Sequence, residues 1–135
     1  MARRPRAKSL PYQFGRLLVT AINAALQLEL DDGDAVMSIR AQEHAQRWHP
    51  MDFARCFPHV ASIISKPLYA RDDFRNDGKI ELVGRPDGFT EYLLVAVEVV
   101  LDAEGRYNVT SFYPVSERKV NDRREKGHLV RVILI

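Results

Sequence analysis

Apolar positions in the first half of the chain recur at the spacing of amphipathic helices. Between residues 12 and 30 they return every three or four positions, and the acidic turn 31–34 ends that run. Further along, Pro58 fits poorly inside a helix, so a break is predicted near Phe57, with Pro58 in the first turn of a fresh helix. The pattern predicts helices over 12–30, 41–48 and 51–65, and a short strand over 35–40.

The second half is rich in β-branched and aromatic residues, as strands are. In the strand expected over 91–102, one parity is uniformly apolar and must face a core, while the other parity includes Glu98. The connection 101–106 is short enough for a hairpin, so the strands on either side of it are predicted to be antiparallel. The predicted strands span 79–85, 91–102, 106–115 and 129–135.

Helices first and strands afterwards predict an α+β fold, in which N-terminal helices pack on one face of a C-terminal antiparallel sheet of about four strands. The other face of that sheet is left free to bind a ligand. With 135 residues, the chain is long enough for one core and too short for two ordinary domains. We therefore expect a single domain over 11–135, preceded by a basic tail over 1–10.

Composition then excludes several classes of protein. The chain is 46% hydrophobic and 28% charged, which excludes collagen-like and disordered classes. Its formal net charge of +2 allows a polyanionic partner without demanding one. No apolar run approaches the roughly 18 residues of a membrane span, so we expect a cytoplasmic protein with no membrane partner. The lone Cys56 excludes an internal disulfide and is expected to be a buried structural thiol rather than a nucleophile.

Three side chains suited to a phosphodiester fall on one predicted helical surface. His44, Arg47 and Trp48 stand at positions i, i+3 and i+4. An imidazole moves protons near neutral pH, a guanidinium neutralises phosphate oxygens, and an indole stacks on a base. The alternative is structural, because tryptophan at helical spacing usually packs in a core. His49, before Pro50, suits either a site or a cap of the turn.

A metal site is not favoured by the histidines. His44 and His49 are five residues apart, which does not place both on one helical face as a spacing of four does. The chain also contains no Gly-rich phosphate loop and no nucleophile elbow. We therefore expect neither a metal nor a cofactor.

Hydroxyl groups interrupt the strand expected over 106–115. Thr110, Ser111 and Tyr113 can bind phosphate oxygens there, although threonine and tyrosine are also ordinary strand formers.

A charged stretch over 117–126 follows that strand, and it includes Arg118 and Lys119. It suits a phosphate track and a solvated charged loop equally well.

The order of these pieces resembles the phage-encoded nucleases of the barnase/EndoU/colicin/RelE group. The resemblance covers about residues 35–135 and is carried by HAQRWHP at 44–50, HVASIISKPLY at 59–69, EYLLVAVEV at 91–99 and TSFYPVS at 110–116. It implies a helical half followed by a curved antiparallel sheet with a cleft on its exposed face. It also implies cleavage of RNA without a metal. A base takes the ribose 2′-OH proton, that oxygen attacks phosphorus, an acid protonates the leaving 5′-oxygen, and a 2′,3′-cyclic phosphate results.

Carried over residue by residue, the resemblance makes His44 the best match for the catalytic imidazole, with His49 second. It matches the strand hydroxyl to Thr110 or Ser111 and leaves Glu98 as an alternative carboxylate base. The implied site has five residues acting on the phosphodiester and four binding the substrate: His44, Arg47, Thr110, Ser111 and Tyr113 in the first group, and Trp48, His49, Arg118 and Lys119 in the second.

The expected function is thus that of a metal-independent endoribonuclease of the toxin or phage-effector type. Its expected partners are RNA, with tRNA among the candidates, and an immunity or antitoxin protein. Two alternatives stay open. The chain can be a catalytically inactive domain of the same fold that binds nucleic acid or protein, or a structural phage protein that assembles through its first helix. The sequence leaves the oligomeric state open.

Overall fold

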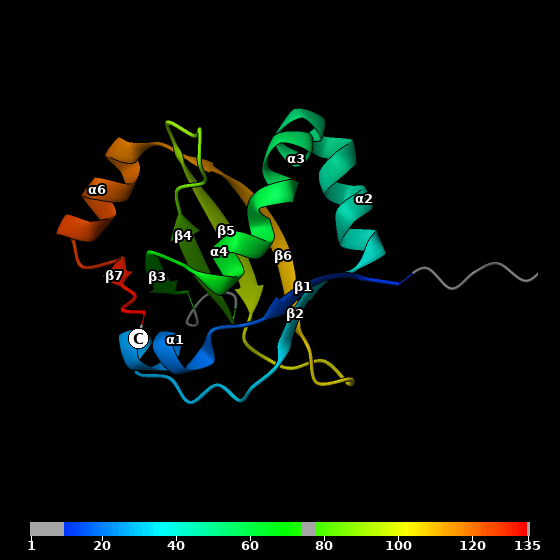
Figure 1. The fold of residues 1–135 in the computed structure, drawn as a ribbon, viewed down its shortest axis with the longest axis horizontal. Helices are drawn as coiled ribbons and strands as arrows, with labels where there is room; N and C mark the ends of the chain where they lie inside the picture. Colours follow the sequence, from blue (N-terminus) through cyan, green and yellow to red (C-terminus); the bar gives the residue numbers. More distant parts are fainter. Residues whose placement is uncertain (1–9, 74–77, 135) are drawn as a thin grey trace, which may run out of the picture.

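A single β-sheet forms the centre of the fold, with a hydrophobic core on each of its faces. The computed structural model describes residues 10–73 and 78–134, so nine residues of the expected basic tail lie outside the described part. Within the described part the sheet has seven strands, in the order β1-β2-β6-β5-β4-β3-β7 (Figure 1). Strands β2 and β6 are parallel, and the other neighbouring strands are antiparallel. The strands are β1 (Tyr12–Arg16), β2 (Asp34–Met37), β3 (Tyr69–Asp72), β4 (Lys79–Gly84), β5 (Tyr92–Glu98), β6 (Tyr107–Val115) and β7 (Val130–Arg131).

The fold is α+β, but the predicted architecture of N-terminal helices on an antiparallel sheet of about four strands is wrong. The sheet is mixed, and seven strands lie in the described residues alone. Strand β1 was hidden because its apolar residues suit helical spacing as well as alternation. Gly15 has a φ of 98° at the register shift between β1 and β2, a bulge that lets the strand bend toward the next helix. Strand β3 has only four residues, too few for an alternation signal.

The helix predicted over 12–30 is shorter than expected and spans only Val19–Leu26, whereas two other helix boundaries follow local chemistry. The break predicted near Phe57 is confirmed, because a 3₁₀ turn that contains Pro58 separates two helices. The charged stretch over 117–126 forms a helix, which Ser116 caps by accepting a hydrogen bond from the Lys119 N–H at 3.2 Å. No helix in the described residues is long and apolar enough to cross a membrane. The helical segments are α1 (Val19–Leu26), α2 (Ile39–Trp48), α3 (Pro50–Cys56), the 3₁₀ turn η1 (Phe57–His59), α4 (Val60–Ser65) and α6 (Glu117–Glu125).

The larger core lies between one face of the sheet and the helices α1, α3 and α4. Leu93, Val95 and Val97 of β5 point into this core, which confirms the apolar parity predicted for that strand. Cys56 is fully buried here, as expected of a structural thiol, and burial raises the pKa of its thiol. A thiol that stays protonated is a poor nucleophile, so Cys56 packs rather than reacts.

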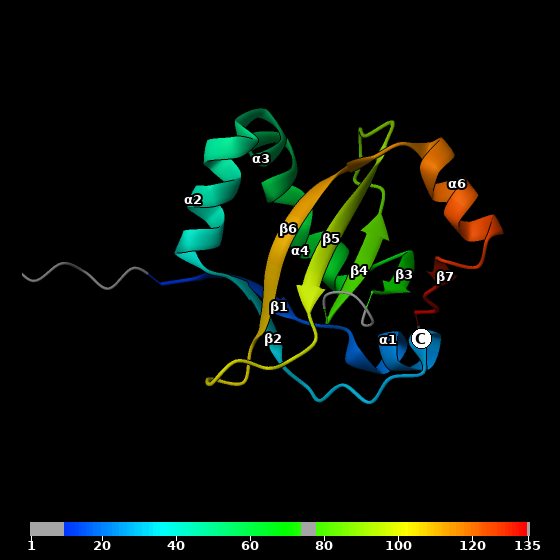
Figure 2. The same ribbon diagram turned by 180° about the vertical axis from the view of Figure 1, so that it is seen from behind.

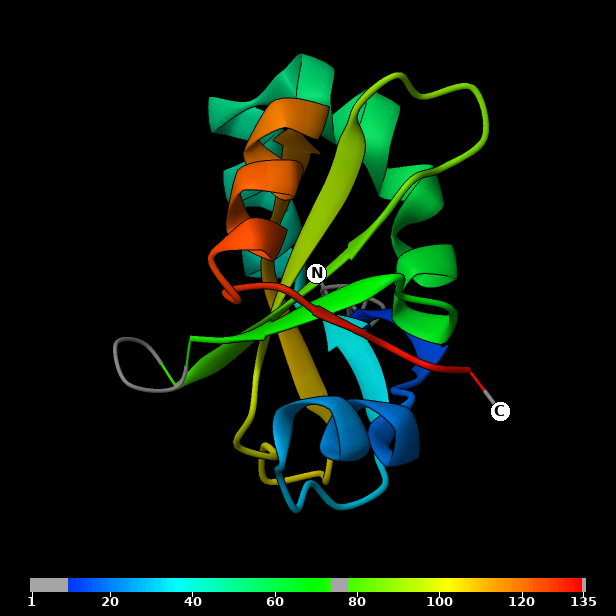
Figure 3. The same cartoon turned by 90° about the vertical axis from the view of Figure 1, so that its left-hand side faces the viewer.

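A smaller core lies on the other face, where α6 packs. It joins Leu94 and Ala96 of β5 to Val120 of α6 and Leu129. Figure 3 shows α6 and α4 on opposite sides of the strands, so helices do not cover one face only. Figure 2 looks onto this second face and shows β6, β5 and β4 without a helix in front of them, between α2 and α6. We call this region the open face and define it by Arg71, Glu81, Ser111 and Tyr113.

The hairpin that joins β5 to β6 is held by one carboxylate. The two strands are antiparallel, as predicted. Asp102 accepts hydrogen bonds from the backbone N–H groups of Glu104 at 2.9 Å and Arg106 at 3.0 Å. Its second oxygen accepts from the side chains of Arg106 and Asn108, each at 3.1 Å. Burial alone would raise the pKa of the Asp102 carboxyl, but these hydrogen bonds together lower it to about 2.

Asp102→Asn is expected to lower the free energy of unfolding at pH 7 by about 1 to 2 kcal/mol. Because the folded-state pKa of about 2 lies below the ordinary 3.8, the carboxylate stabilises the fold above about pH 4 and stops doing so as pH falls toward 2. Urea unfolding of both proteins should therefore show a gap in stability at pH 7 that narrows below pH 4. A gap of constant size over that range would contradict the assignment.

Candidate active site on the open face

A row of side chains crosses the open face from β6 to β3. The strand registers place Ser111 opposite Ala96, Ala96 opposite Glu81, and Glu81 opposite Arg71. Residues opposite one another on antiparallel strands share a face and stand about 5 Å apart. Ala96 puts only a methyl group between the Ser111 hydroxyl and the Glu81 carboxylate. The row thus places a hydroxyl group near an ion pair.

Glu81 is the one charged residue buried among the described residues, with 8% of its surface exposed. It lies between Ile80 and Leu82, both fully buried. Its carboxylate accepts a hydrogen bond from Arg71 Nη1 at 2.9 Å, which compensates the buried negative charge. Because a partly buried ion pair is seldom more stabilising than apolar residues of similar size, its presence in an apolar strand makes Glu81 a candidate for a functional role.

Tyr113 lies beside this row, one pleat further along β6, opposite Leu94. It is 37% exposed. Burial raises the pKa of its hydroxyl, and the negative charge of Glu81 adds to that rise, while Arg123 and Arg71 oppose it. The hydroxyl therefore carries its proton at neutral pH and can donate it. The charges of Glu81, Arg71 and Arg123 thus all act on the Tyr113 hydroxyl.

Arg123 brings a second guanidinium to the open face from α6. It follows Val120 by three positions, so it shares the helix face that packs on the sheet. Its Nη1 atom is buried and has no hydrogen-bond partner among the described residues. A buried donor without a partner usually costs about 1 to 3 kcal/mol, and more when it is charged. An ordered water or a bound anion satisfies such an atom.

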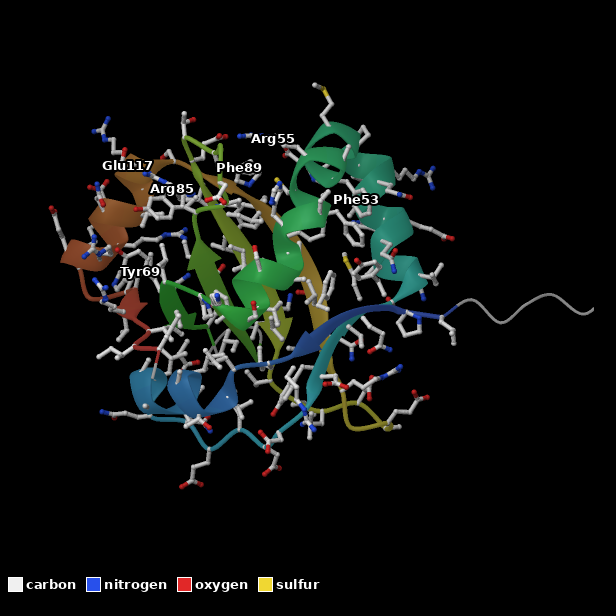
Figure 4. The ribbon with its side chains drawn as sticks, in the orientation of Figure 1. Phe53, Arg55, Tyr69, Arg85, Phe89 and Glu117 are labelled. Carbon is white, nitrogen blue, oxygen red and sulfur yellow. The ribbon has the colours of Figure 1, made fainter. Side chains whose placement is uncertain are left out.

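Arginine–aromatic contacts fix α6 at the border of the open face. The Arg85 guanidinium lies 4.3 Å from the ring centre of Tyr92. It also forms an ion pair with the Glu117 carboxylate at the start of α6, at 3.4 Å. Near the other end of the helix, the Arg124 guanidinium lies 4.6 Å from the ring centre of Tyr69. Figure 4 shows Arg85 and Glu117 meeting beside α6. These contacts hold the helix, and with it Arg123, against the sheet.

A similar contact joins α3 to the loop between β4 and β5. Arg55 makes two hydrogen bonds to the Glu91 carboxylate, and its guanidinium lies 4.2 Å from the ring centre of Phe89 (Figure 4). The hydrogen bond from Arg55 lowers the pKa of the Glu91 carboxyl. His59 adds an edge-to-face contact with the same ring, at 5.0 Å. This cluster joins α3 and η1 to the loop between β4 and β5, and the charges of Arg55 and Glu91 are paired with each other.

The three candidates on α2 come together, but they are exposed on a helix beside β6 (Figure 2) and are not part of the row. The His44 ring lies 6.3 Å from the ring of Trp48, and the Arg47 guanidinium 5.7 Å from it. Helix α2 packs through Ala41 and Ala45 on the larger core, which belongs to the opposite face. No hydrogen bond, ion pair or ring contact in the described structure joins His44 to the open face. Trp48 is 61% exposed, so it is not a core tryptophan.

The candidates on β6 divide between two positions. Ser111 and Tyr113 are part of the open face. Thr110 lies at the irregularity between β5 and β6, and its hydroxyl donates a hydrogen bond to the Ala96 carbonyl at 3.5 Å. Thr110 therefore shapes the strand next to the row. Whether any of the three acts on a substrate stays a prediction.

The remaining candidates are all exposed, and of these Glu98 alone is on a strand of the row. His49 ends α2 and precedes α3 without a side-chain capping hydrogen bond. Arg118 and Lys119 lie in the first turn of α6. Glu98 ends β5 opposite Lys79, two positions beyond Ala96. Their roles in binding or catalysis stay predictions.

Sequence reasoning missed Glu81, Arg71 and Arg123. A signal for Glu81 was present, because a single carboxylate between Ile80 and Leu82 interrupts an apolar strand. Arg71 lies in β3, which was not predicted, and Arg123 was hidden among the other charges of 117–126. The strands of the row follow one another along the chain, but the registers that set these residues opposite each other cannot be read from any single strand.

Comparison with known proteins finds no match to this chain, whether among family models, curated proteins or solved structures. The described part of the chain also holds no group of three or more His, Cys, Asp or Glu residues that could bind a metal ion. The function therefore has to be argued from the open face itself.

Proposed function

We propose that this protein is an endoribonuclease that cleaves RNA by attack of the ribose 2′-OH, and that its active site is the open face with Arg123. The observation that carries the proposal is the buried Glu81 carboxylate, paired with Arg71 on the same face as the Tyr113 hydroxyl, with a second guanidinium on the helix that packs there. Cleavage of this kind needs a proton acceptor, a proton donor and cations around one phosphate. The resemblance seen in the sequence points to the same chemistry.

Each group has a role in the proposed reaction. Glu81 accepts the 2′-OH proton, and the freed oxygen attacks phosphorus. Tyr113 donates its proton to the 5′-oxygen as the bond from phosphorus to that oxygen breaks. Arg71 and Arg123 hold the phosphate oxygens while negative charge builds on them. The products are a 2′,3′-cyclic phosphate and a 5′-hydroxyl end, with the proton on Glu81 returned to Tyr113 through water.

An RNA cleavage assay in EDTA tests the proposal. The protein is expected to produce a cleavage ladder that grows with time and is unaffected by EDTA. The main alternative is an inactive binding domain, which would bind RNA with an affinity that falls steeply with salt and produce no ladder. Binding without cleavage would overturn the proposed function in favour of that alternative.

His44→Ala is expected to lower the cleavage rate less than about tenfold, through weaker substrate binding at α2. The reason is its position on α2, which packs on the larger core and contributes no residue to the row of Glu81 and its neighbours. Single-turnover kinetics of His44→Ala and Trp48→Ala should show similar, modest losses. A loss of about a hundredfold or more in His44→Ala alone would assign proton transfer to α2 instead.

A further inference from the structure

A cavity of about 520 Å³ lies at the β3 end of the row. Its walls come from three separate places: the end of α1, strand β3, and the turn between α6 and β7. Its volume is in the range of sites that hold a small ligand. Arg71 lines this cavity and also pairs with Glu81. Arg71 therefore links the cavity to the proposed active site.

Several residues of the cavity lining suit a nucleotide, and the lining also includes one acidic residue, Asp72. Arg71 and His128 can donate hydrogen bonds to a phosphate. Leu26 and Val130 offer aliphatic surface for the face of a base. The amide of Gln27 supplies both a donor and an acceptor for the edge of a base.

Gln27 is also the one described non-glycine residue with a positive φ, at 56°. It ends α1 in the left-handed conformation, a position where glycine is usual and a longer side chain costs stability. Backbone strain of this kind is most often kept where a side chain has a task. Here the strained residue lines the cavity.

We propose that this cavity binds one nucleotide of the RNA strand, next to the scissile phosphate. Arg71 and His128 hold the phosphate of that nucleotide, and Gln27 contacts its base. The inference rests on the proposed function, because it assigns the cavity to the same substrate.

Calorimetric titration with the four nucleoside 3′-monophosphates, and with inorganic phosphate alone, tests the binding without any cleavage. At least one nucleotide should bind more tightly than inorganic phosphate. His128→Ala and Gln27→Gly should each weaken that binding, by about tenfold for His128→Ala, which loses a hydrogen bond to a charged group. Gln27→Gly should unfold at the same temperature or higher, because glycine relieves the positive φ. Lys126→Ala, an exposed change near the same turn, should bind as wild type does.

Equal affinity for inorganic phosphate and the nucleotides would show an anion site only and overturn the nucleotide assignment. Unchanged nucleotide binding in both variants, or no binding to wild type, would overturn it as well. RNA cleavage by wild type separates the two proposals. If RNA is cut while both variants bind nucleotides normally, the cavity inference fails and the proposed function stands. If the variants lose nucleotide binding but wild type cuts no RNA, the cavity binds nucleotides and the proposed function fails.

Discussion

Glu81→Gln is expected to lower the rate of RNA cleavage by about a hundredfold to ten-thousandfold, the usual contribution of a positioned general base. The amide keeps the size of the carboxylate and can still accept the hydrogen bond from Arg71. It cannot take a proton from the ribose 2′-OH. Single-turnover cleavage with saturating protein separates this effect from a change in RNA affinity, which should move little.

Glu98→Gln is the matched control for that change. Glu98 lies on the next strand and is exposed, so the same loss of charge there should change the rate less than threefold if Glu98 takes no part in catalysis. Circular dichroism and thermal unfolding of both variants check that the sheet is intact. Full activity in a folded Glu81→Gln variant would remove Glu81 from the mechanism, and a large loss in Glu98→Gln would move the base to Glu98.

Arg123→Met is expected to lower the cleavage rate by about a hundredfold or more, as the loss of one group that stabilises transition-state charge does. Its effect on stability should have the opposite sign or be absent. The change removes a buried Nη1 that has no hydrogen-bond partner among the described residues, and removing such an atom raises the free energy of unfolding by up to about 1 kcal/mol. Methionine keeps the aliphatic packing of the side chain.

Lower activity without lower stability is the mark of a group kept for function. Urea unfolding and cleavage rates should be measured on the same preparations, with Lys126→Met as a control for the loss of one positive charge at an exposed position. If Arg123→Met unfolds more easily and cuts RNA at the wild-type rate, Arg123 is a structural residue and the phosphate is held elsewhere.

The features that the sequence predicted correctly are those that depend on residues close together in the chain. The helix break at Phe57 follows from the ring of Pro58, and the apolar parity of β5 follows from the pleat of a strand. The β5–β6 hairpin follows from a connection that is short enough to turn back directly.

The architecture was mispredicted where the deciding contacts are distant in sequence. Strand β2 pairs in parallel with β6, some seventy positions later, and no pattern in either strand specifies its neighbour. Helix α6 covers the face of the sheet opposite α4. It was not predicted as a helix because Val120 is its only buried apolar residue among many charges, and such a sequence gives a weak helical signal.

In the candidate site, too, some residues could be selected from the sequence and others are identified only by the fold. Tyr113 and Ser111 were selected because hydroxyl groups in a strand are visible in the sequence. The α2 residues were selected because three useful side chains share a helix face, and the structure confirms only that they meet each other. Pairing between β3 and β4 brings Arg71 to Glu81, and the packing of α6 brings Arg123 near Tyr113. The first depends on the register of a hairpin whose strand β3 was not predicted, and the second depends on tertiary packing.

The most direct test of the account is the chemistry of the ends that cleavage leaves. An RNA of defined sequence is digested in EDTA by wild type and by Glu81→Gln, beside the same RNA with a 2′-deoxy sugar at the cleavage site, and the products are read by mass spectrometry. The account predicts 2′,3′-cyclic phosphate and 5′-hydroxyl ends from wild type alone, and an intact 2′-deoxy RNA. Products with 5′-phosphate ends, or cleavage of the 2′-deoxy RNA at the same bond, would contradict it.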